Sequence, residues 1–432
     1  MSAFGVILAT AILVVLIVIE FPIAFAFAAA SVTLAAVTGR DLALVLPTAF
    51  WQTGGFALLA LPLFIVAGTV MRSAQISDRL VAVVERVAGR VRGSLGAVTV
   101  VSCMVFGAIS GSGAAAIAAI GSVMIPKMDE AGYGRGYATA LVACSSVLAL
   151  LIPPSIPMIV FALTAGISVS AAFLSTVGPA IVIAIGFVAI NHRFARRHGV
   201  DSGRNFVKGR DPSFATVLLR GGPALLMPVL MLGGIYSGAF TPTEAAAVAL
   251  VYAIAMGLFV YRTLGMRTLG RAFVESGAVT ASVTTILFFL LIFSQLLSLD
   301  AIPRKIATAM LSITEDHVLV LLMINLVLLI LGMFIDDISG SILAAVILMP
   351  VATRIGVDPI HFAAIVGTNL GLGNVTPPCA PLLFVAGSIG GIELRHFIRP
   401  ALRFMLVGHL PVVLLVTFVP ELSLALPSLL RD

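Results

Sequence analysis

The same proline pattern interrupts two long apolar stretches of the chain. Residues 153–157 read PPSIP and residues 377–381 read PPCAP, so the second cluster follows the first by 224 positions. The same interval separates Pro126 from Pro350. Since proline makes up only about 5% of an average protein, this gapless agreement indicates an internal repeat. The predicted helix-breaking residues are Pro153, Pro154, Pro157, Pro377, Pro378 and Pro381. The chain therefore contains two copies of one unit, each with a broken helix.

The amino-acid composition places these stretches in lipid. Of the 432 residues, 60% are apolar and only 10% are charged, whereas a soluble globular protein carries about 25% charged residues. A membrane-spanning helix needs roughly 20 apolar residues, so the chain is long enough for about ten crossings. The composition therefore predicts an all-α polytopic membrane protein and excludes a large soluble domain.

Basic residues are concentrated between the apolar runs. The net charge is +6, and eighteen of the 25 Lys and Arg residues lie at 72–92, 192–220, 262–271 and 395–403. Short basic connectors mark the cytoplasmic side of a membrane protein. We therefore expect these four connectors in the cytoplasm and both termini in the periplasm, and the charge implies no nucleic-acid partner.

Threading the chain from these connectors predicts two repeats in opposite orientation. Each repeat makes five crossings, and because five is odd, the second copy enters from the other face of the membrane. The first inverted repeat covers residues 1–200, with a re-entrant hairpin at about 94–126 and a broken helix at about 137–166. A basic linker at 201–215 precedes the second, at 216–432, with its hairpin at about 317–349 and its broken helix at about 359–391. Residues 73–92 alternate charged and apolar groups at helical spacing, which predicts an amphipathic helix on the membrane surface.

The broken helices create a need for ligands. A proline pair removes two amide donors, and irregular backbone at membrane depth persists only where it is buried in protein or lines a wet cavity. Released carbonyls and half-helix ends commonly bind coupling cations such as sodium, whereas half-helix N-termini favour anionic groups. Polar residues near the two breaks agree with this interpretation: Ser110, Ser112, Ser145 and Ser155, then Asp336, Asp337, Ser339, Thr368, Asn369 and Thr376.

Other readings of these residues stay open. Ser and Gly in apolar helices commonly serve close helix packing, and Asp336-Asp337 could lie at an aqueous face rather than in the membrane. The sequence has no phosphate-binding loop and no metal-ligand spacing among its His and Cys residues. We therefore expect no enzyme, no ATP hydrolysis and no cofactor, and transport energy from an ion gradient.

Several segments resemble the large membrane subunit of tripartite ATP-independent periplasmic (TRAP) transporters of the DctM or SiaM type. The resemblance rests on residues 110–133 (SGSGAAAIAAIGSVMIPKMDEAGY), 150–160 (LLIPPSIPMIV), 332–337 (GMFIDD) and 356–378 (GVDPIHFAAIVGTNLGLGNVTPP). It implies an elevator-type symporter in the bacterial inner membrane that uses sodium to import an organic acid. It also implies a periplasmic substrate-binding protein and a small four-helix membrane subunit on a separate chain.

The resemblance also implies roles for individual residues. The sodium-binding residues would be Ser110, Gly111, Ser112, Ser145 and Pro153 in the first half and Asp337, Ser339, Gly340, Thr368, Asn369 and Thr376 in the second. The substrate would lie near Ser112, Gly113, Ser155, Asn369 and Thr376. Sodium is the only metal expected.

Two other functions compete with this one. A self-sufficient sodium symporter of the dicarboxylate/citrate type would share the inverted hairpin architecture but take its substrate without a binding protein. A membrane-embedded enzyme would need a convergent set of His, Asp and Ser residues, and the sequence offers no such set.

Overall fold

The computed structural model describes residues 2–19, 21–88, 93–200, 214–314 and 316–429. Every regular element within these ranges is a helix. Seven of the described helices are long and apolar enough to cross a membrane, or eight if one sharply bent pair is counted as a span. The predicted all-α polytopic class is therefore confirmed. Of the predicted linker at 201–215, residues 201–213 lie outside the described residues.

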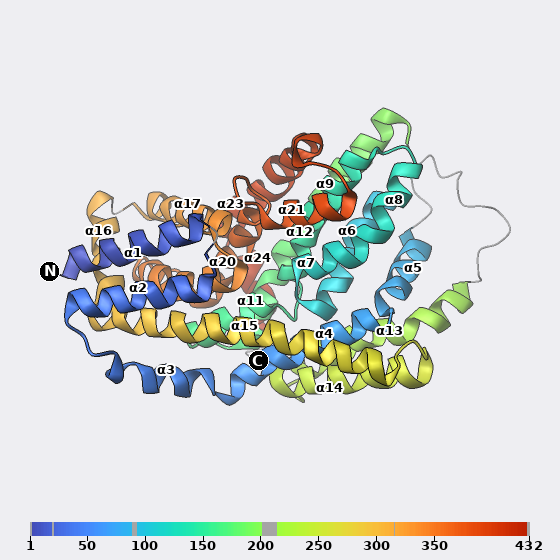
Figure 1. Cartoon of the computed structure of the whole chain (residues 1–432). Coiled ribbons are helices and arrows are strands. Elements are labelled where there is room, and N and C mark those ends of the chain that lie inside the picture. The colour runs from blue at the N-terminus through green and yellow to red at the C-terminus, as the bar shows by residue number, and fades with distance from the viewer. Residues whose placement is uncertain (1, 20, 89–92, 201–213, 315, 430–432) are drawn as a thin grey trace.

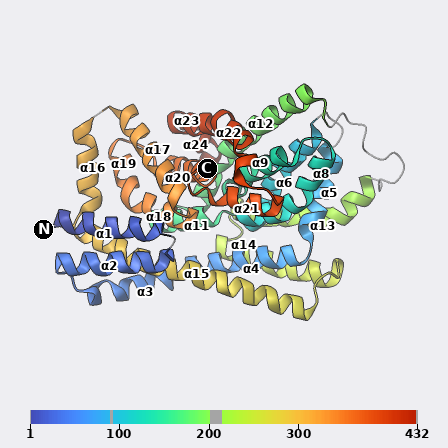
Figure 2. The same cartoon turned by 45° about the horizontal axis from the view of Figure 1, so that its top comes forward.

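One side of the molecule is a layer built along the longest helix, α15 (Met266–Leu299). Figures 1 and 2 show α2, α3 and α4 lying along it, with α1 packed on α2 and α14 packed on α4. We call this group the α15 layer. Its other members are α1 (Ser2–Val18), α2 (Ile23–Thr38), α3 (Leu46–Thr53), α4 (Ala60–Ser73) and α14 (Pro242–Ala255). The chain bends by 117° between α2 and the segment 42–53, a turn that the hydropathy pattern did not predict.

The opposite side holds a helical hairpin from each half of the chain. In the first hairpin, α6 (Ser94–Ser110) and α7 (Gly113–Ala116) meet at a short tip, and a π-helical turn joins α7 to α8 (Ser122–Glu130). In the second, α17 (His317–Phe334) and α18 (Asp337–Leu343) meet at residues 335–336, and a π-helical turn at 344–348 leads to α19 (Met349–Arg354). Both predicted hairpins are therefore present.

Both predicted broken helices are present, and both break at the proline pair. The first comprises α9 (Arg135–Ser146), α10 (Leu148–Leu151) and α11 (Ile156–Ala165), and the second comprises α20 (Pro359–Gly373) and α21 (Pro381–Gly390). Each helix stops because proline has no amide hydrogen to donate and disfavours helical backbone in the residue before it. We call the hairpins, the broken helices and the helices packed around them the hairpin layer.

The two broken helices lie antiparallel. At one end, Arg135 Nε donates a hydrogen bond to the Gly390 carbonyl over 2.6 Å. At the other end, the rings of Phe161 and Phe362 lie 6.1 Å apart. The start of the first broken helix therefore meets the end of the second, and the end of the first meets the start of the second. Corresponding elements that run in opposite directions are what an inverted repeat requires.

The remaining helices close the hairpin layer. They are α5 (Ile76–Ala88), α12 (Val169–His198), α13 (Phe214–Tyr236), α16 (Ile302–Ile313), α22 (Ile398–Arg403), α23 (Leu410–Phe418) and α24 (Glu421–Ser428). The helix α24 packs on α12, and the hydropathy pattern did not predict it. The prediction for 73–92 needs a correction, because Leu80, Val83 and Val84 on the apolar face of α5 are buried in protein rather than facing lipid.

Candidate functional site

The first hairpin tip touches the first helix break. A Cβ atom on Gly111 would lie 2.3 Å from the Pro154 carbonyl oxygen, far inside van der Waals contact. Gly111 also has a φ of +58°, which L side chains rarely adopt. Only glycine therefore allows the tip to approach the break this closely.

Two predicted serines cap the helices that begin at this contact. Ser112 Oγ accepts a hydrogen bond from Ala115 N at 3.3 Å, and Ser155 Oγ accepts one from Met158 N at 3.4 Å. Both are N-caps, which fix where a helix begins. Beside them, a Cβ on Gly113 would lie 3.1 Å from Leu382 of the second repeat. The first tip, the first break and the start of α21 therefore meet in one place.

A threonine that the sequence reading missed satisfies one of the carbonyls released at the first break. Thr176 Oγ1, buried on α12, donates to the Leu151 carbonyl over 2.6 Å. Ser145, near the end of α9, is fully buried, and its hydroxyl has no partner in the described part of the chain. Ser110 Oγ accepts from Ser112 N at 3.4 Å. At the first break, therefore, the Leu151 carbonyl has a donor and the Ser145 hydroxyl has no partner among the described residues, and neither group is charged.

The second tip carries two carboxylates instead. Asp336 caps α18, because its Oδ2 accepts from Ile338 N at 3.0 Å and from Ser339 N at 3.2 Å. The remaining oxygen of Asp336 and the Oδ1 atom of Asp337 are buried without a partner among the described residues, and so is the Ser339 hydroxyl. Unpaired buried oxygens are costly unless a ligand satisfies them. These unpartnered oxygens lie together at the start of α18.

The second tip also lies against its own broken helix. A Cβ on Gly373 would lie 2.5 Å from the backbone of Gly332, and a Cβ on Gly340 would lie 3.1 Å from Leu370. The equivalent contact in the first half joins Gly107 to the backbone of Ala149, with a distance of 2.3 Å from the added Cβ. In both halves, therefore, an arm of the hairpin packs closely on the broken helix just before its break.

The predicted residues of α20 take part in a buried polar network. Asn369 Nδ2 donates to Asn325 Oδ1 of α17 over 2.6 Å, which leaves Asn369 Oδ1 without a partner. The carbonyl of Thr368 bonds to His409 Nε2 at 2.9 Å, while the Thr368 hydroxyl donates back to its own helix. Thr376 is likewise back-bonded, to the Leu372 carbonyl. The sequence reading missed Asn325 and His409, although each is an isolated polar residue within an apolar run.

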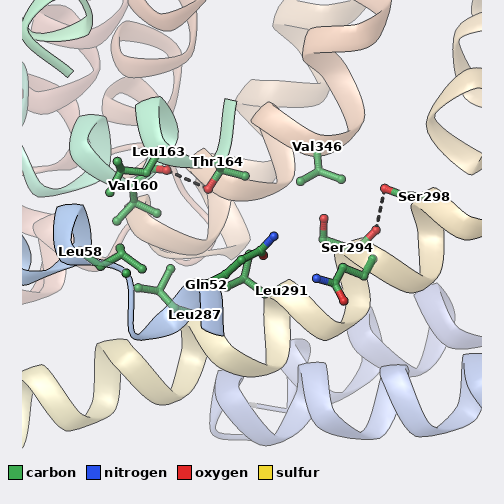
Figure 3. Close-up of a pocket in the computed structure, with 12 residues that line it drawn as sticks. Gln52, Leu58, Val160, Leu163, Thr164, Leu287, Leu291, Ser294, Ser298 and Val346 are labelled. Atoms are coloured by element: carbon green, nitrogen blue, oxygen red, sulfur yellow. Dashed lines mark hydrogen bonds between the residues drawn. The ribbon is translucent and has the colours of Figure 1, made fainter. Parts of the chain in front are cut away.

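The cavity drawn in Figure 3 lies between the two layers, where α11 and the π-helical turn at 344–348 face α15. It has a volume of about 510 Å³. Gln52, Leu287, Ser294 and Gln295 line it from the α15 layer, and Thr164 is among the residues that line it from α11. None of its twelve lining residues is charged, and none of the predicted site residues reaches it. Sequence patterns could not reveal this cavity, because its walls come from segments far apart in the chain.

Residues of metal-ligand type do not gather elsewhere. No group of three or more His, Cys, Asp or Glu residues could hold a metal ion within the described ranges. Cys103 and Cys144 are buried, whereas Cys379, at the position equivalent to Ser155, is exposed.

Comparisons with known proteins agree with this architecture. Residues 10–422 match the family described as "Tripartite ATP-independent periplasmic transporter, DctM component". The C4-dicarboxylate TRAP transporter large permease protein DctM of Pseudomonas aeruginosa is 36% identical over 397 residues, which cover 90% of each chain. The sialic acid TRAP transporter large permease protein SiaM of Vibrio cholerae is 33% identical over 87% of each chain.

Two further matches differ in kind. The isethionate TRAP transporter permease protein DctMQ of Oleidesulfovibrio alaskensis is 34% identical over 94% of this chain, but this chain spans only 64% of that relative. The crystal structure of the YdaH transporter of Alcanivorax borkumensis superposes with a TM-score of 0.61 over 88% of each chain, at 16% identity. This last match concerns the fold alone.

The family match and the identity to large permeases cover nearly the whole chain. They confirm the predicted resemblance and place the chain among membrane transporters rather than enzymes. The chain belongs to the DctM component family of tripartite ATP-independent periplasmic transporters.

Proposed function

We propose that the chain is the sodium-coupled permease of a TRAP-type importer and carries an organic acid across the bacterial inner membrane. The observation that carries this proposal is the meeting of two hairpin tips with two antiparallel broken helices, one with neutral caps and one with carboxylates. Such a pair of half-sites suits a transporter that moves a cation and an acid together.

Sodium would occupy the oxygen-rich places near the breaks. In the second half, the unpaired oxygens of Asp336, Asp337, Ser339 and Asn369 are the hard, negatively polarised ligands that a small cation prefers. In the first half, only neutral groups are available, such as the Ser145 hydroxyl. The assignment of Ser110, Gly111, Ser112, Ser145 and Pro153 to one ion and of Asp337, Ser339, Gly340, Thr368, Asn369 and Thr376 to another stays part of this proposal.

The acid would lie at the helix starts near Ser112, Gly113 and Ser155, close to Asn369 and Thr376. The N-terminus of α11 supports this position, because helix starts attract anions. Named substrates of the relatives, a C4-dicarboxylate, a sialic acid and isethionate, are all acids. The substrate proposed for this chain is therefore a small organic acid.

Movement would occur between the two layers. The cavity of Figure 3 separates α11 from α15, and its uncharged lining contains no ion pair that would hold the layers together. We infer that residues 1–200 and 216–432 are the two inverted repeats and that the hairpin layer slides against the α15 layer as an elevator. Both termini would lie in the periplasm.

The permease would work with two separate proteins. One is a small four-helix membrane subunit, and the other is a periplasmic binding protein that delivers the acid. The family description supports this proposal, since it names a component of a tripartite system.

Reconstitution tests this function directly. Liposomes containing the chain and a small TRAP membrane subunit would be supplied with a TRAP binding protein and radiolabelled succinate, sialic acid or isethionate. We expect uptake that needs both an inward sodium gradient and the binding protein. Equal uptake without the binding protein would favour the self-sufficient symporter, and equal uptake with choline in place of sodium would refute sodium coupling.

A further inference from the structure

A chain of hydrogen bonds fixes the orientation of one side chain near the second break. It begins at Asn325, which lies within α17 and is 7% exposed. Asn325 Nδ2 donates to the Leu321 carbonyl over 2.8 Å. Because a carbonyl oxygen can only accept, the nitrogen of Asn325 must face Leu321. The Oδ1 atom of Asn325 is therefore the end that faces the neighbouring helices.

Two donors converge on that oxygen. Asn369 Nδ2 reaches it from α20 over 2.6 Å, and Thr417 Oγ1 reaches it from α23 over 3.2 Å. Thr417 has one hydroxyl hydrogen, and the Val413 carbonyl of its own helix also lies within reach at 2.7 Å, so the two acceptors share that hydrogen. Three helices therefore meet at one buried acceptor, and the bond to Asn325 uses the nitrogen end of the Asn369 carboxamide.

This bond leaves the oxygen of the Asn369 carboxamide free. Its Oδ1 atom has no partner in the part of the chain that the structure describes, and the residue is only 1% exposed. Reversing the Asn369 carboxamide would set two carbonyl oxygens against each other, so the network allows only one orientation. An acceptor that is kept free in a buried site costs stability unless a ligand with positive charge occupies it.

The first half of the chain has no such device. The positions equivalent to Asn325 and Asn369 are Val101 and Ser145. Valine offers no acceptor, and the Ser145 hydroxyl has no partner among the described residues. A hydroxyl can rotate to donate or accept, so it needs no partner to fix its polarity. The positioning network therefore belongs to the half that carries the carboxylates.

We propose that Asn325 is a positioning residue that holds the Asn369 carboxamide with its oxygen, rather than its nitrogen, available to the coupling sodium ion. This inference rests on the proposed function, because it assumes a sodium ion at the second break. Asn325 itself touches no ion. It acts by fixing which end of the Asn369 carboxamide faces the ion. The Thr417 hydroxyl helps to hold Asn325 in place.

The test measures binding of radioactive sodium to the purified full chain, since this needs neither substrate nor partner. In Asn325→Leu the Asn369 carboxamide can turn, so we expect the sodium dissociation constant to rise by about tenfold. In Asn325→Asp the protonated acid can donate to Leu321 and accept from Asn369, so sodium binding should return to within about threefold of wild type. Thr417→Val is the matched control, since it removes the longer bond to Asn325 and a bond within its own helix but keeps the bond between Asn325 and Asn369, and we expect a change of less than about twofold.

Asn369→Ala separates the inference from the proposed function. A weakened Asn369→Ala variant with an unchanged Asn325→Leu variant would overturn the positioning role and leave the second sodium site standing. No effect of either variant would overturn both. If Asn325→Leu fails to elute as a folded monodisperse species, Asn325→Thr replaces it. The threonine hydroxyl can bond to the Leu321 carbonyl, but the side chain is too short to reach Asn369.

Discussion

The two helix breaks share one backbone design and differ in charge. In both halves, a proline pair ends a helix and a hairpin arm packs on the segment before the break through a glycine contact. Ser112 caps the first hairpin helix, and Asp336 caps the second at the equivalent position. The first break offers hydroxyls and carbonyls alone, whereas the second adds two carboxylates and an oriented carboxamide.

This difference shows how a duplicated fold can hold two different ligands. The proline pairs and the glycine contacts set the geometry, and they are common to both copies. The caps and the neighbouring helices set the electrostatics, and they differ between the copies. We therefore expect changes to the proline pairs or the glycine contacts to reduce the binding of both the cation and the acid. Changes to the caps of the second half should reduce cation binding first.

The largest expected effect comes from closing the space at the first tip. In Gly111→Ala the new Cβ would lie 2.3 Å from the Pro154 carbonyl oxygen at a φ of +58°. We expect uptake in liposomes to fall to background and the unfolding free energy to drop by about 2 kcal/mol or more.

Gly166→Ala is the matched control for this variant. Gly166 also has a positive φ, +69°, but no atom lies within 4 Å of an added Cβ. It should cost about 1 kcal/mol of stability and keep uptake. Equal loss of uptake in both variants would show that backbone strain, not the contact between tip and break, is responsible.

The carboxylate of Asp337 is the next most sensitive group. We expect Asp337→Asn to raise the sodium concentration needed for half-maximal thermal stabilisation by about tenfold or more, since hydrogen bonds and contacts to charged groups are the stronger class. Asp336→Asn should have a smaller effect, because asparagine caps helices as well as aspartate does. Unaltered sodium titrations in both variants would move these carboxylates to an aqueous rim.

Removing the missed threonine tests how the first break is satisfied. Thr176→Val leaves the Leu151 carbonyl without its 2.6 Å donor, so the unfolding free energy should fall by about 1–3 kcal/mol. Chemical denaturation in detergent would measure it. Thr33→Val removes a hydroxyl that bonds only within its own helix, and it should change stability by less than about 0.5 kcal/mol. Equal values for the two variants would contradict the role of Thr176.

The smallest expected effect concerns the cavity between the layers. Ser294→Leu partly fills the space in Figure 3, so uptake should slow by about threefold while sodium binding stays unchanged. Ser282→Leu adds the same side chain to an exposed position of α15 and should leave uptake intact. A cavity without a role in movement would give the same uptake in both variants.

The sequence predicted those parts of the fold that prolines and hydropathy determine locally. Both hairpins and both broken helices are present. The bend after α2 and the helix α24 were not predicted, because neither is marked by a proline pair or a long apolar run. The apolar face of α5 was assigned to lipid, since hydropathy cannot distinguish lipid from the buried side of a neighbouring helix.

The predicted site residues show the same limit. Ser112, Ser155 and Asp336 cap helix starts, and their roles in binding stay predictions. The partners of the breaks come from other helices, namely Thr176 from α12, Asn325 from α17 and His409 from the last span. Tertiary packing alone brings these residues together, so no spacing in the sequence could identify them.

Equilibrium binding of radioactive sodium to the purified full chain would show whether the second break holds a coupling cation. We expect saturable binding that unlabelled sodium displaces, that potassium and choline do not displace, and that Asp337→Asn weakens. A folded, monodisperse chain that shows no saturable sodium binding, or binds equally well after Asp337→Asn and Asn369→Ala, would contradict the proposed sodium site.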